Sequence, residues 1–321
     1  MYTELLSNEH REAYGRLSLA CGNIFSTLSW LEMFGNQVRI FGIYDKANNL
    51  IGGFHVFVKK VYGLSFCRNC PLTPSIGLFC DVRATNPVAA LGMWKEVLTE
   101  VAKRLDRLPA AVTSCSLDTY IVDAQPFIWR KFKVVPGYTY VLDLALTTEE
   151  LRSKMSNGKR GDINAALRDG LEVHRLHEFS AVEQLNEKTF ARQEKKFARL
   201  DLKKTLFSFA APHNSFAFAV FKDGQPIAAN FCVYDRNTAF ALLGGYDHKQ
   251  KHHGAYTLAF WQSIQLAKEL GLQYFNFDGS MVPRIEHYLR GFGGRLTPYY
   301  RVNKAFLPIE IVLKFIKREL F

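Results

Sequence analysis

Residues 274–294 bring together side chains that are suited to acid–base chemistry. The stretch reads YFNFDGSMVPRIEHYLRGFGG, and in it Asp278 ends a strand-like apolar run at a Gly-Ser turn. A short polar helix is expected next, with His287 and Tyr288 on it before the glycine-rich end. Carboxylate, imidazole and phenol groups can each take or give a proton during catalysis. Asp278 is also a favoured residue type for capping the next helix, so a structural role is the open alternative.

A second stretch, residues 244–271, has the pattern of a phosphate-binding helix start. A strand-like run ends in two glycines, a basic loop follows, and a helix begins near residue 254. The free amides and the positive dipole end of a helix N-terminus attract phosphate. An ordinary solvated loop is the alternative. The residues predicted to hold a phosphate-bearing cofactor are Gly245, Lys249, Lys251, Gly254 and Ala255.

A third stretch, SNGKRGDINAALRDG at residues 156–170, places a Lys-Arg pair just before an amphipathic helix. Lys159 and Arg160 are suited to hold an anionic group, because the arginine offers a bidentate fork. A charged, solvated helix face is the alternative here.

Charge and composition narrow the class of partner. The chain has 321 residues with 41 Lys+Arg against 30 Asp+Glu, a net charge of +11. This excess favours a polyanionic partner, which is tRNA, a nucleotide-linked substrate or an anionic membrane surface. No apolar run reaches the roughly 18 residues of a spanning helix, and the start lacks a secretory pattern, so we expect a cytoplasmic protein. The six cysteines are scattered, and CRNC at 67–70 lacks a second ligand pair, so no metal site is predicted.

The order of the expected elements predicts a duplicated α/β unit. In the first half, residues 39–60 have the pattern of a β-hairpin, 87–105 of a long helix and 111–117 of a strand. In the second half, 215–247 predict three strands, with 256–270 a helix and 273–278 a strand. We place the boundary near 143–150, which gives domains 1–145 and 146–321. Further elements are expected as helices at 8–20, 23–35, 151–170, 180–199 and 306–320, and as strands at 137–146 and 172–176.

These stretches, in this order, resemble the GNAT acyltransferase superfamily, and within it the duplicated branch of FemABX peptidyltransferases and related acetyltransferase-like domains. The K-R-x-x-I-x-x-A-x-x-x-G run of that branch is similar to residues 159–170. The hairpin KDGQPIAANFCVYDRNTAFALLGGYD is similar to its strands, and FDGS and FGG are similar to its closing motif. The resemblance covers residues 140–303 and extends loosely to 23–60.

The resemblance implies an α/β (α+β) fold of tandem GNAT-like domains, each a mixed, mostly antiparallel sheet flanked by helices. The C-terminal domain is expected to carry the active site. In GNAT folds an acyl donor lies between two parallel strands that splay apart, and its pyrophosphate lies on the next helix. In this chain those strands are expected at 238–245 and 273–278. The acyl-CoA signature is only half present in KHHGAY at 251–256.

Three functions follow from the resemblance. The leading one is an N-acyltransferase that moves an acyl group from acetyl-CoA or another acyl-CoA to a small-molecule or peptide amine. The second is a FemABX-type transferase that uses aminoacyl-tRNA and adds amino acids to a peptidoglycan precursor. The third is a silent binding module that kept the fold. A tRNA user is expected to show a continuous basic stripe joining 152–168 with 192–204, whereas a CoA user needs free backbone amides at 251–255.

The resemblance also assigns roles to single residues. Asp278 is expected to face the acceptor amine, which is nucleophilic only when neutral, while His287 and Tyr288 serve the leaving group. The closing motif of the family has a lysine where Leu289 stands, and Arg290 is the predicted substitute for that charge. The residues predicted to bind substrate are Lys159, Arg160, Gly293 and Tyr299.

The terminal helix expected at 306–320 is amphipathic. Its apolar side is suited to pack on the core, on a partner subunit or on a membrane, and its basic residues keep peripheral membrane contact open. The oligomeric state is not predicted.

Overall fold

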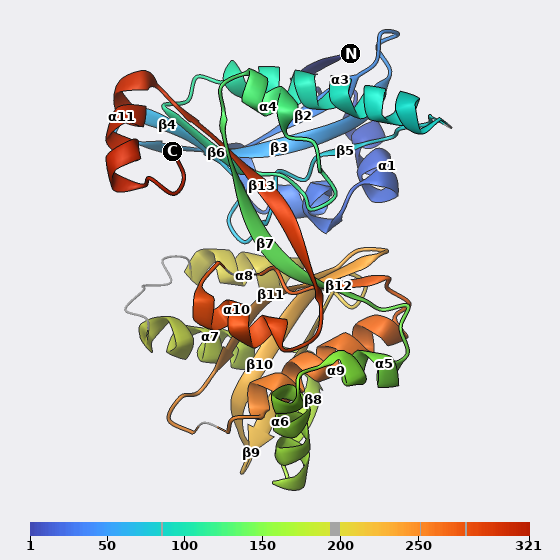
Figure 1. Cartoon of the computed structure of the whole chain (residues 1–321), viewed down its shortest axis with the longest axis vertical. Coiled ribbons are helices and arrows are strands. Elements are labelled where there is room, and N and C mark those ends of the chain that lie inside the picture. Colours follow the sequence, from blue (N-terminus) through green and yellow to red (C-terminus); the bar gives the residue numbers. More distant parts are fainter. Residues whose placement is uncertain (85, 193–199, 251, 280) are drawn as a thin grey trace. The chain divides into compact units, whose positions relative to one another are not determined.

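A computed structural model describes residues 1–84, 86–192, 200–250, 252–279 and 281–321 (Figure 1). Packing divides them into two units. Unit 1 consists of Met1–Gly137 and Pro298–Phe321, and unit 2 consists of Tyr138–Thr297. Two strands, β7 (Lys133–Asp143) and β13 (Arg295–Ala305), each pass from one unit to the other.

Unit 1 is a sheet covered by helices. Its strands are β1 (Tyr2–Leu5), β2 (Val38–Tyr44), β3 (Leu50–Val61), β4 (Leu64–Arg68), β5 (Phe79–Cys80), β6 (Val112–Ser116) and the end of β13. Its helices are α1 (Arg11–Cys21), α2 (Leu28–Glu32), α3 (Pro87–Asp106), α4 (Gln125–Trp129) and α11 (Leu307–Ile316). The core of unit 1 forms where the strands meet α3, around Phe54, Val97 and Phe127.

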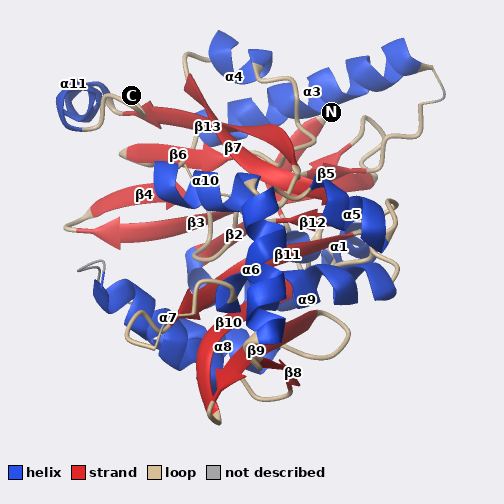
Figure 2. Ribbon diagram, turned by 60° about the horizontal axis from the view of Figure 1, so that its bottom comes forward, coloured by secondary structure: helices blue, strands red, loops and turns tan. Residues whose placement is uncertain are grey.

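Unit 2 is also a sheet with helices packed on it (Figure 2). Its strands are the end of β7, β8 (Glu172–Leu176), β9 (Ser215–Lys222), β10 (Gln225–Tyr234), β11 (Thr238–Tyr246) and β12 (Tyr274–Asn276). Its helices are α5 (Thr148–Lys154), α6 (Asn157–Arg168), α7 (Ser180–Arg192), α8 (Leu200–Phe209), α9 (Ala255–Glu269) and α10 (Pro283–Arg290). Its core surrounds α9, nine of whose 15 residues are buried.

The two units have the same strand order. Unit 1 runs β1-β2-β3-β4-β6-β13, and unit 2 runs β8-β9-β10-β11-β12-β7. In each unit one neighbouring pair is parallel, β4 with β6 and β11 with β12, and a long helix, α3 or α9, connects its strands. The other neighbours pair antiparallel. The predicted fold class, a mixed and mostly antiparallel sheet flanked by helices, is confirmed.

Each unit takes its sixth strand from the other half of the sequence. β13 pairs with β6 in unit 1, and β7 pairs with β12 in unit 2. Residues 298–321 therefore pack with the first half of the chain, although the sequence boundary assigns them to the second. Whether 1–145 and 146–321 fold as separate domains stays a prediction, because packing units do not measure independent folding.

Local side chains explain where predicted helices end. The single helix expected at 23–35 is wrong: Asn23 and Thr27 each cap a new start, which leaves two 3-10 turns around the short α2. The basic region 151–170 is likewise two helices, because Ser156 caps the amide of Lys159 and starts α6. The turn at Asp223-Gly224 has φ of 50° and 73°, which fits the predicted tight hairpin. Strands β1, β4 and β13 were not predicted.

Candidate functional site

The two parallel strands of unit 2 pair over only a short distance. Thr238 faces Tyr274, and the pairing ends where Phe240 faces Asn276. β11 continues to Tyr246, whereas β12 stops at Asn276. The strands thus pair along the first part of β11 only. The resemblance to GNAT folds predicts that strands at 238–245 and 273–278 splay apart.

Asp278 lies two residues beyond the end of β12, in a left-handed conformation with φ of 46°. Its backbone is fixed, because its amide donates to Asn276 Oδ1 at 2.9 Å and the Gly279 amide donates to Thr139 Oγ1 at 2.8 Å. Thr139 in turn donates to Asn276 at 2.8 Å. The loop is therefore held in a strained conformation by a buried Thr–Asn pair.

The carboxylate of Asp278 has no hydrogen bond or ion pair with any residue that the structure describes. Burial raises the pKa of Asp278 to about 7, because the charged form loses hydration without gaining a partner. It does not cap α10, since that helix begins at Pro283 with Val282 in the capping position. Asp278 is therefore not the cap of α10.

A cluster of aromatic rings packs beside this loop. Phe277 lies with its ring centroid 5.2 Å from that of Phe292 and 5.5 Å from that of Phe260. Tyr288 stacks on Tyr256 at 5.7 Å. The rings come from α9, α10 and the segments that follow β12 and α10, so the cluster joins these elements in unit 2.

Lys159 is buried in this cluster. Its ammonium lies 3.3 Å from the ring centroid of Tyr288, 3.3 Å from Thr257 Oγ1 and 3.5 Å from Asp162 Oδ2. Burial lowers the pKa of Lys159, and the nearby carboxylate of Asp162 limits this fall. The phenol of Tyr288 is 3.2 Å from Thr257 Oγ1, and burial raises the pKa of Tyr288 well above its usual value. Lys159 therefore connects α6 to α9 and α10.

Arg160, His287 and Arg290 each contact residues that are near in the sequence. Arg160 donates to the carbonyls of Ser153 and Met155 at 2.8 and 2.7 Å, and so closes the end of α5. Arg290 is exposed, pairs with Glu286 at 3.3 Å and donates to His287 Nδ1 at 3.1 Å. Leu289 is buried, so Arg290 points from a different face of α10 than the residue that it was expected to replace.

The start of α9 is closed rather than open. The Gly254 amide donates to His252 Nδ1 at 3.1 Å, and the Ala255 amide donates to the carbonyl of His252 at 3.1 Å. A Cβ at Gly254 would lie 2.0 Å from the carbonyl oxygen of Asp162, so α6 packs against this glycine. His252 is itself held at 3.1 Å by Asp169. Two of the amides expected to receive a pyrophosphate are therefore occupied.

The other predicted residues are more dispersed. Gly245 packs against the backbone of Leu185, where a Cβ would lie 2.4 Å from the carbonyl oxygen. Lys249 is exposed, and Lys251 lies outside the described residues, as does the middle of the basic stripe at 193–199. Gly293 has φ of 79° and lies against the Lys154 carbonyl. Tyr299 belongs to unit 1, where Arg301 donates to its hydroxyl at 3.2 Å.

The structure thus brings Lys159 and Tyr288 into direct contact and places Asp278 next to their aromatic cluster. Sequence reasoning missed Thr257 and Asp162, which complete the surroundings of the ammonium. No local signal marks Thr257, because its partners are 98 and 31 residues away in the chain.

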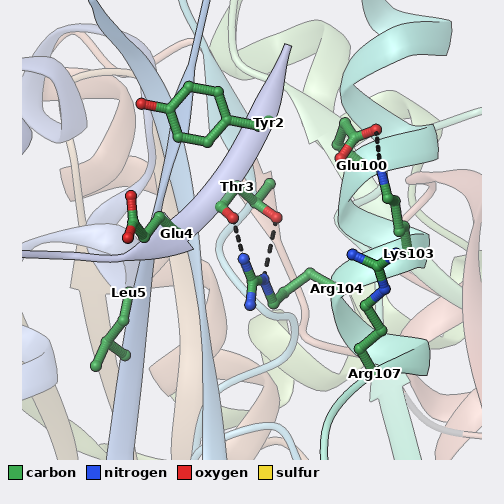
Figure 3. Close-up of a pocket in the computed structure, with 8 residues that line it drawn as sticks. All are labelled: Tyr2, Thr3, Glu4, Leu5, Glu100, Lys103, Arg104 and Arg107. Carbon is green, nitrogen blue, oxygen red and sulfur yellow. Dashed lines mark hydrogen bonds and ion pairs between the residues drawn. The ribbon is translucent and has the colours of Figure 1, made fainter. Parts of the chain in front are cut away.

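A hollow of about 540 Å³ lies in unit 1 between β1 and α3 (Figure 3). Two of its basic residues are engaged: Lys103 forms an ion pair with Glu100 at 3.1 Å, and Arg104 donates hydrogen bonds to Thr3. None of the predicted site residues lines it. Among the described residues, no group of three potential metal ligands has the arrangement of a metal site.

Part of unit 2 is similar to a known domain family. Residues 151–288 match the acetyltransferase (GNAT) domain family. Among curated proteins, the aspartate/glutamate leucyltransferase of Helicobacter hepaticus is 33% identical over 95 residues, which are 28% of this chain and 37% of that relative. The match thus spans well under half of the relative's length.

Two solved structures share the fold over almost the whole chain. FemX superposes with a TM-score of 0.69 at 12% identity, covering 98% of this chain and all of FemX. L-PGS from Bacillus licheniformis gives a TM-score of 0.56 at 16% identity, covering 99% of this chain and 98% of that one. The chain therefore has a FemX-like fold, and residues 151–288 resemble a GNAT domain.

Proposed function

We propose that the chain transfers an aminoacyl group from aminoacyl-tRNA to an amine acceptor, with Asp278 as the base. The observation that carries this proposal is the carboxylate of Asp278 just beyond the shorter parallel strand, which has no partner among the residues that the structure describes. A carboxyl group whose pKa is about 7 is partly ionised at neutral pH and is well matched to take a proton from an amine.

The reaction exchanges one bond and moves one proton from the amine to the leaving oxygen. The neutral amine attacks the ester carbonyl that joins the amino acid to the terminal ribose. A C–N bond forms and the C–O bond to the ribose breaks, while Asp278 takes the proton that the nitrogen loses and returns it to the ribose oxygen, which leaves as a hydroxyl group. Tyr288 keeps its proton because its pKa is raised by burial, and we assign it as a hydrogen-bond donor toward the leaving oxygen.

The start of α9 favours aminoacyl-tRNA over CoA as the donor. A pyrophosphate on a helix N-terminus needs free amides, and here His252 occupies those of Gly254 and Ala255. The net charge of +11 supports a polyanionic donor. The relative from Helicobacter hepaticus is a leucyltransferase by name, which supports transfer of an amino acid.

Acyl-CoA is the second candidate donor, because the parting of β11 and β12 is what a GNAT acyl donor requires. The family that matches residues 151–288 is described as an acetyltransferase domain. For this reaction the roles of Asp278 and the acceptor amine stay the same, and the thiolate of CoA replaces the ribose oxygen as the leaving group.

The donor is tested by two parallel binding measurements. Calorimetry with acetyl-CoA and longer acyl-CoAs is run at about 0.15 M salt, where unspecific charge effects are reduced. In parallel, a mixture of radiolabelled aminoacyl-tRNAs is incubated with the protein, and protection of the ester from hydrolysis is followed. We expect no saturable heat with acyl-CoA and protection of at least one aminoacyl ester. Saturable micromolar acyl-CoA binding without ester protection would transfer the proposal to the second donor.

The base is tested by transfer of the label from the protected donor to peptide amines. Asp278→Asn is expected to bind the donor normally and to lose at least about 100-fold in transfer rate, because no group then takes the proton. Asp223→Asn, which changes an exposed turn carboxylate of the same unit, is the matched control. Equal rates for Asp278→Asn and the native chain would remove Asp278 from the mechanism. Binding of neither donor would favour a silent binding module.

A further inference from the structure

Helix α11 leaves most of its apolar surface uncovered. None of its ten residues is buried, and the side chain of Phe315 is 85% exposed. The exposed apolar residues fall on one continuous side of the helix at helical spacing. They are Leu307, Ile311, Val312, Phe315 and Ile316, with Phe306 just before the helix.

The opposite side of α11 is the one that packs on unit 1. Ile309, Glu310 and Leu313 are half-buried there, and the strand β13 leads directly into the helix. The helix is thus attached to unit 1, and its exposed apolar side faces away from that contact. By contrast, the helix α9 of unit 2 is less apolar overall and buries nine residues. Exposing so apolar a side to water is costly, which marks it as an interaction surface.

A second exposed apolar point lies at the same end of the unit 1 sheet. Two backbone hydrogen bonds connect it to α11: Phe306 N donates to Ala111 O at 2.9 Å, and Ala111 N donates to Ser65 O at 2.8 Å. Ser65 follows the tight turn between β3 and β4, where Tyr62 is fully exposed and has φ of 49°. Figures 1 and 2 show α11 and β4 at this end of unit 1.

Basic residues border both apolar points. Lys59 and Lys60 precede the turn on β3, and both are exposed. Lys317 and Arg318 follow α11, are exposed and have no ion pair with any described residue. Lys314 pairs with Glu310 at 2.9 Å, and Glu319 is the other acidic residue of this segment. The surface therefore combines apolar side chains with an excess of positive charge.

We propose that this surface, made of α11 and the β3–β4 turn, binds the face of a membrane that carries anionic lipid. An apolar helix side bordered by lysine and arginine is the pattern of a helix that lies in the interface plane of a bilayer. Protein interfaces instead exclude lysine from their apolar centre, which argues against a protein partner or a second copy. No described helix is long and apolar enough to cross a bilayer, so the contact is peripheral. This inference does not rest on the proposed transfer reaction.

Vesicle sedimentation tests the proposal with the full chain. The vesicles contain phosphatidylcholine alone or with about 30% phosphatidylglycerol, at about 0.15 M and about 0.5 M salt. We expect binding to the anionic vesicles, at least about 10-fold weaker binding to the neutral ones, and weaker binding at the higher salt. Equal binding to both kinds of vesicle, or to neither, would overturn the proposal.

Three variants locate the binding surface. The triple change Ile311→Ser, Phe315→Ser and Ile316→Ser is expected to weaken binding at least about 10-fold without changing the melting temperature, because these side chains are exposed. The double change Lys317→Gln and Arg318→Gln is expected to remove most of the salt dependence. The control pair Val88→Ser and Leu91→Ser, which alters exposed apolar residues of α3, is expected to bind normally.

Two results would contradict the assignment of α11 as the lipid contact. If the triple variant sediments with anionic vesicles as well as the native chain does, α11 is not the lipid contact. If light scattering shows a dimer that the triple variant converts to a monomer, a second copy of the chain covers α11 instead.

Discussion

Asp118 of unit 1 and Asp278 of unit 2 occupy equivalent positions in two sheets of the same strand order. Each lies two residues beyond the end of the second parallel strand, β6 or β12. The residue before each aspartate donates its amide to the strand that the unit takes from the other half: Leu117 N to Tyr300 O at 2.8 Å, and Phe277 N to Tyr140 O at 3.0 Å.

The two carboxylates differ in what surrounds them. Asp118 accepts hydrogen bonds from Asn23 Nδ2 at 2.7 Å, Ser75 Oγ at 2.6 Å and the Leu78 amide at 3.2 Å. Burial raises the pKa of Asp118 to about 6, and these hydrogen bonds limit the rise. Asp278 has no such donors among the described residues, and burial raises its pKa to about 7.

The comparison shows that one backbone position can have two different surroundings. In unit 1 the carboxylate accepts three hydrogen bonds from two other segments, Asn23 and the loop at residues 75–78, and is fully used by the fold. In unit 2 the same position holds a carboxylate that no described residue engages. A perturbed pKa without structural partners is the property expected of a functional group.

The largest expected effect on stability comes from removing Asp118, the carboxylate that has hydrogen-bond partners. Asp118→Ala leaves two buried donors and one half-buried donor without this acceptor, and each buried donor costs about 1–3 kcal/mol, so the free energy of unfolding falls by about 3 kcal/mol or more. Urea unfolding of Asp118→Ala and Asp278→Ala in parallel measures the difference. A similar loss in both variants would mean that the two sites are not distinct.

The next effect distinguishes the helices that connect the parallel strands. Gly254→Ala places a Cβ 2.0 Å from the Asp162 carbonyl, and we expect overpacking to cost about 1–3 kcal/mol of unfolding free energy. Gly92→Ala in α3 meets no atom within 4 Å and is expected to stabilise by about 0.5–1 kcal/mol. Thermal and urea unfolding of both variants provide the measurement. Tolerance of Gly254→Ala would mean that α6 does not close the start of α9.

The pH dependence of stability sharpens the contrast further. Because the folded pKa of Asp278 is raised, its stabilising contribution is full below pH ~4, where the unfolded carboxyl is also protonated, and is lost as the pH rises through about 7. The free energy of unfolding of Asp278→Asn should not decline in this way, and at pH 8 it should exceed that of the native chain by on the order of 1 kcal/mol. This value is reduced because Asp278 is only half-buried and solvent screens its charge. Unfolding series at pH 4–8 would show parallel curves for both proteins if the carboxyl were not perturbed.

The smallest expected effect is on the bare helix. Phe315→Ser changes a side chain that is 85% exposed, so the unfolding free energy should stay within about 0.5 kcal/mol of the native value. Phe260→Ala in α9 removes a buried ring and is expected to cost about 3–5 kcal/mol. Urea unfolding of the two variants compares α9, whose apolar side is buried, with α11, whose apolar side is exposed.

Much of the fold was readable from local pattern. The hairpin at 39–60, the helix at 87–105 and the three strands at 215–247 are all present, because their periodicity and turn residues act over a few positions. The broken segment 23–35 was misjudged, since its apolar spacing is helical while Asn23 and Thr27 restart the chain. Strand β13 was missed because its sequence does not alternate as a half-buried strand does.

The candidate site was predicted unevenly for a similar reason. Asp278 could be singled out because an acid at a strand end is a local feature. The engagement of Arg160 with carbonyls of α5, the contact of Lys159 with Tyr288 and the closure of Gly254 by α6 all depend on packing between segments far apart in the chain.

By itself, the sequence determined the alternation of strands and helices, the excess of positive charge and the acid at the end of β12. Only the tertiary structure decided that the two halves exchange their sixth strands, that Asp118 is partnered while no described residue engages the carboxylate of Asp278, and that α11 stays uncovered. The physical reason is range: backbone propensity and side-chain periodicity act between neighbours, whereas burial and hydrogen-bond partners are set by segments that meet only when the chain folds.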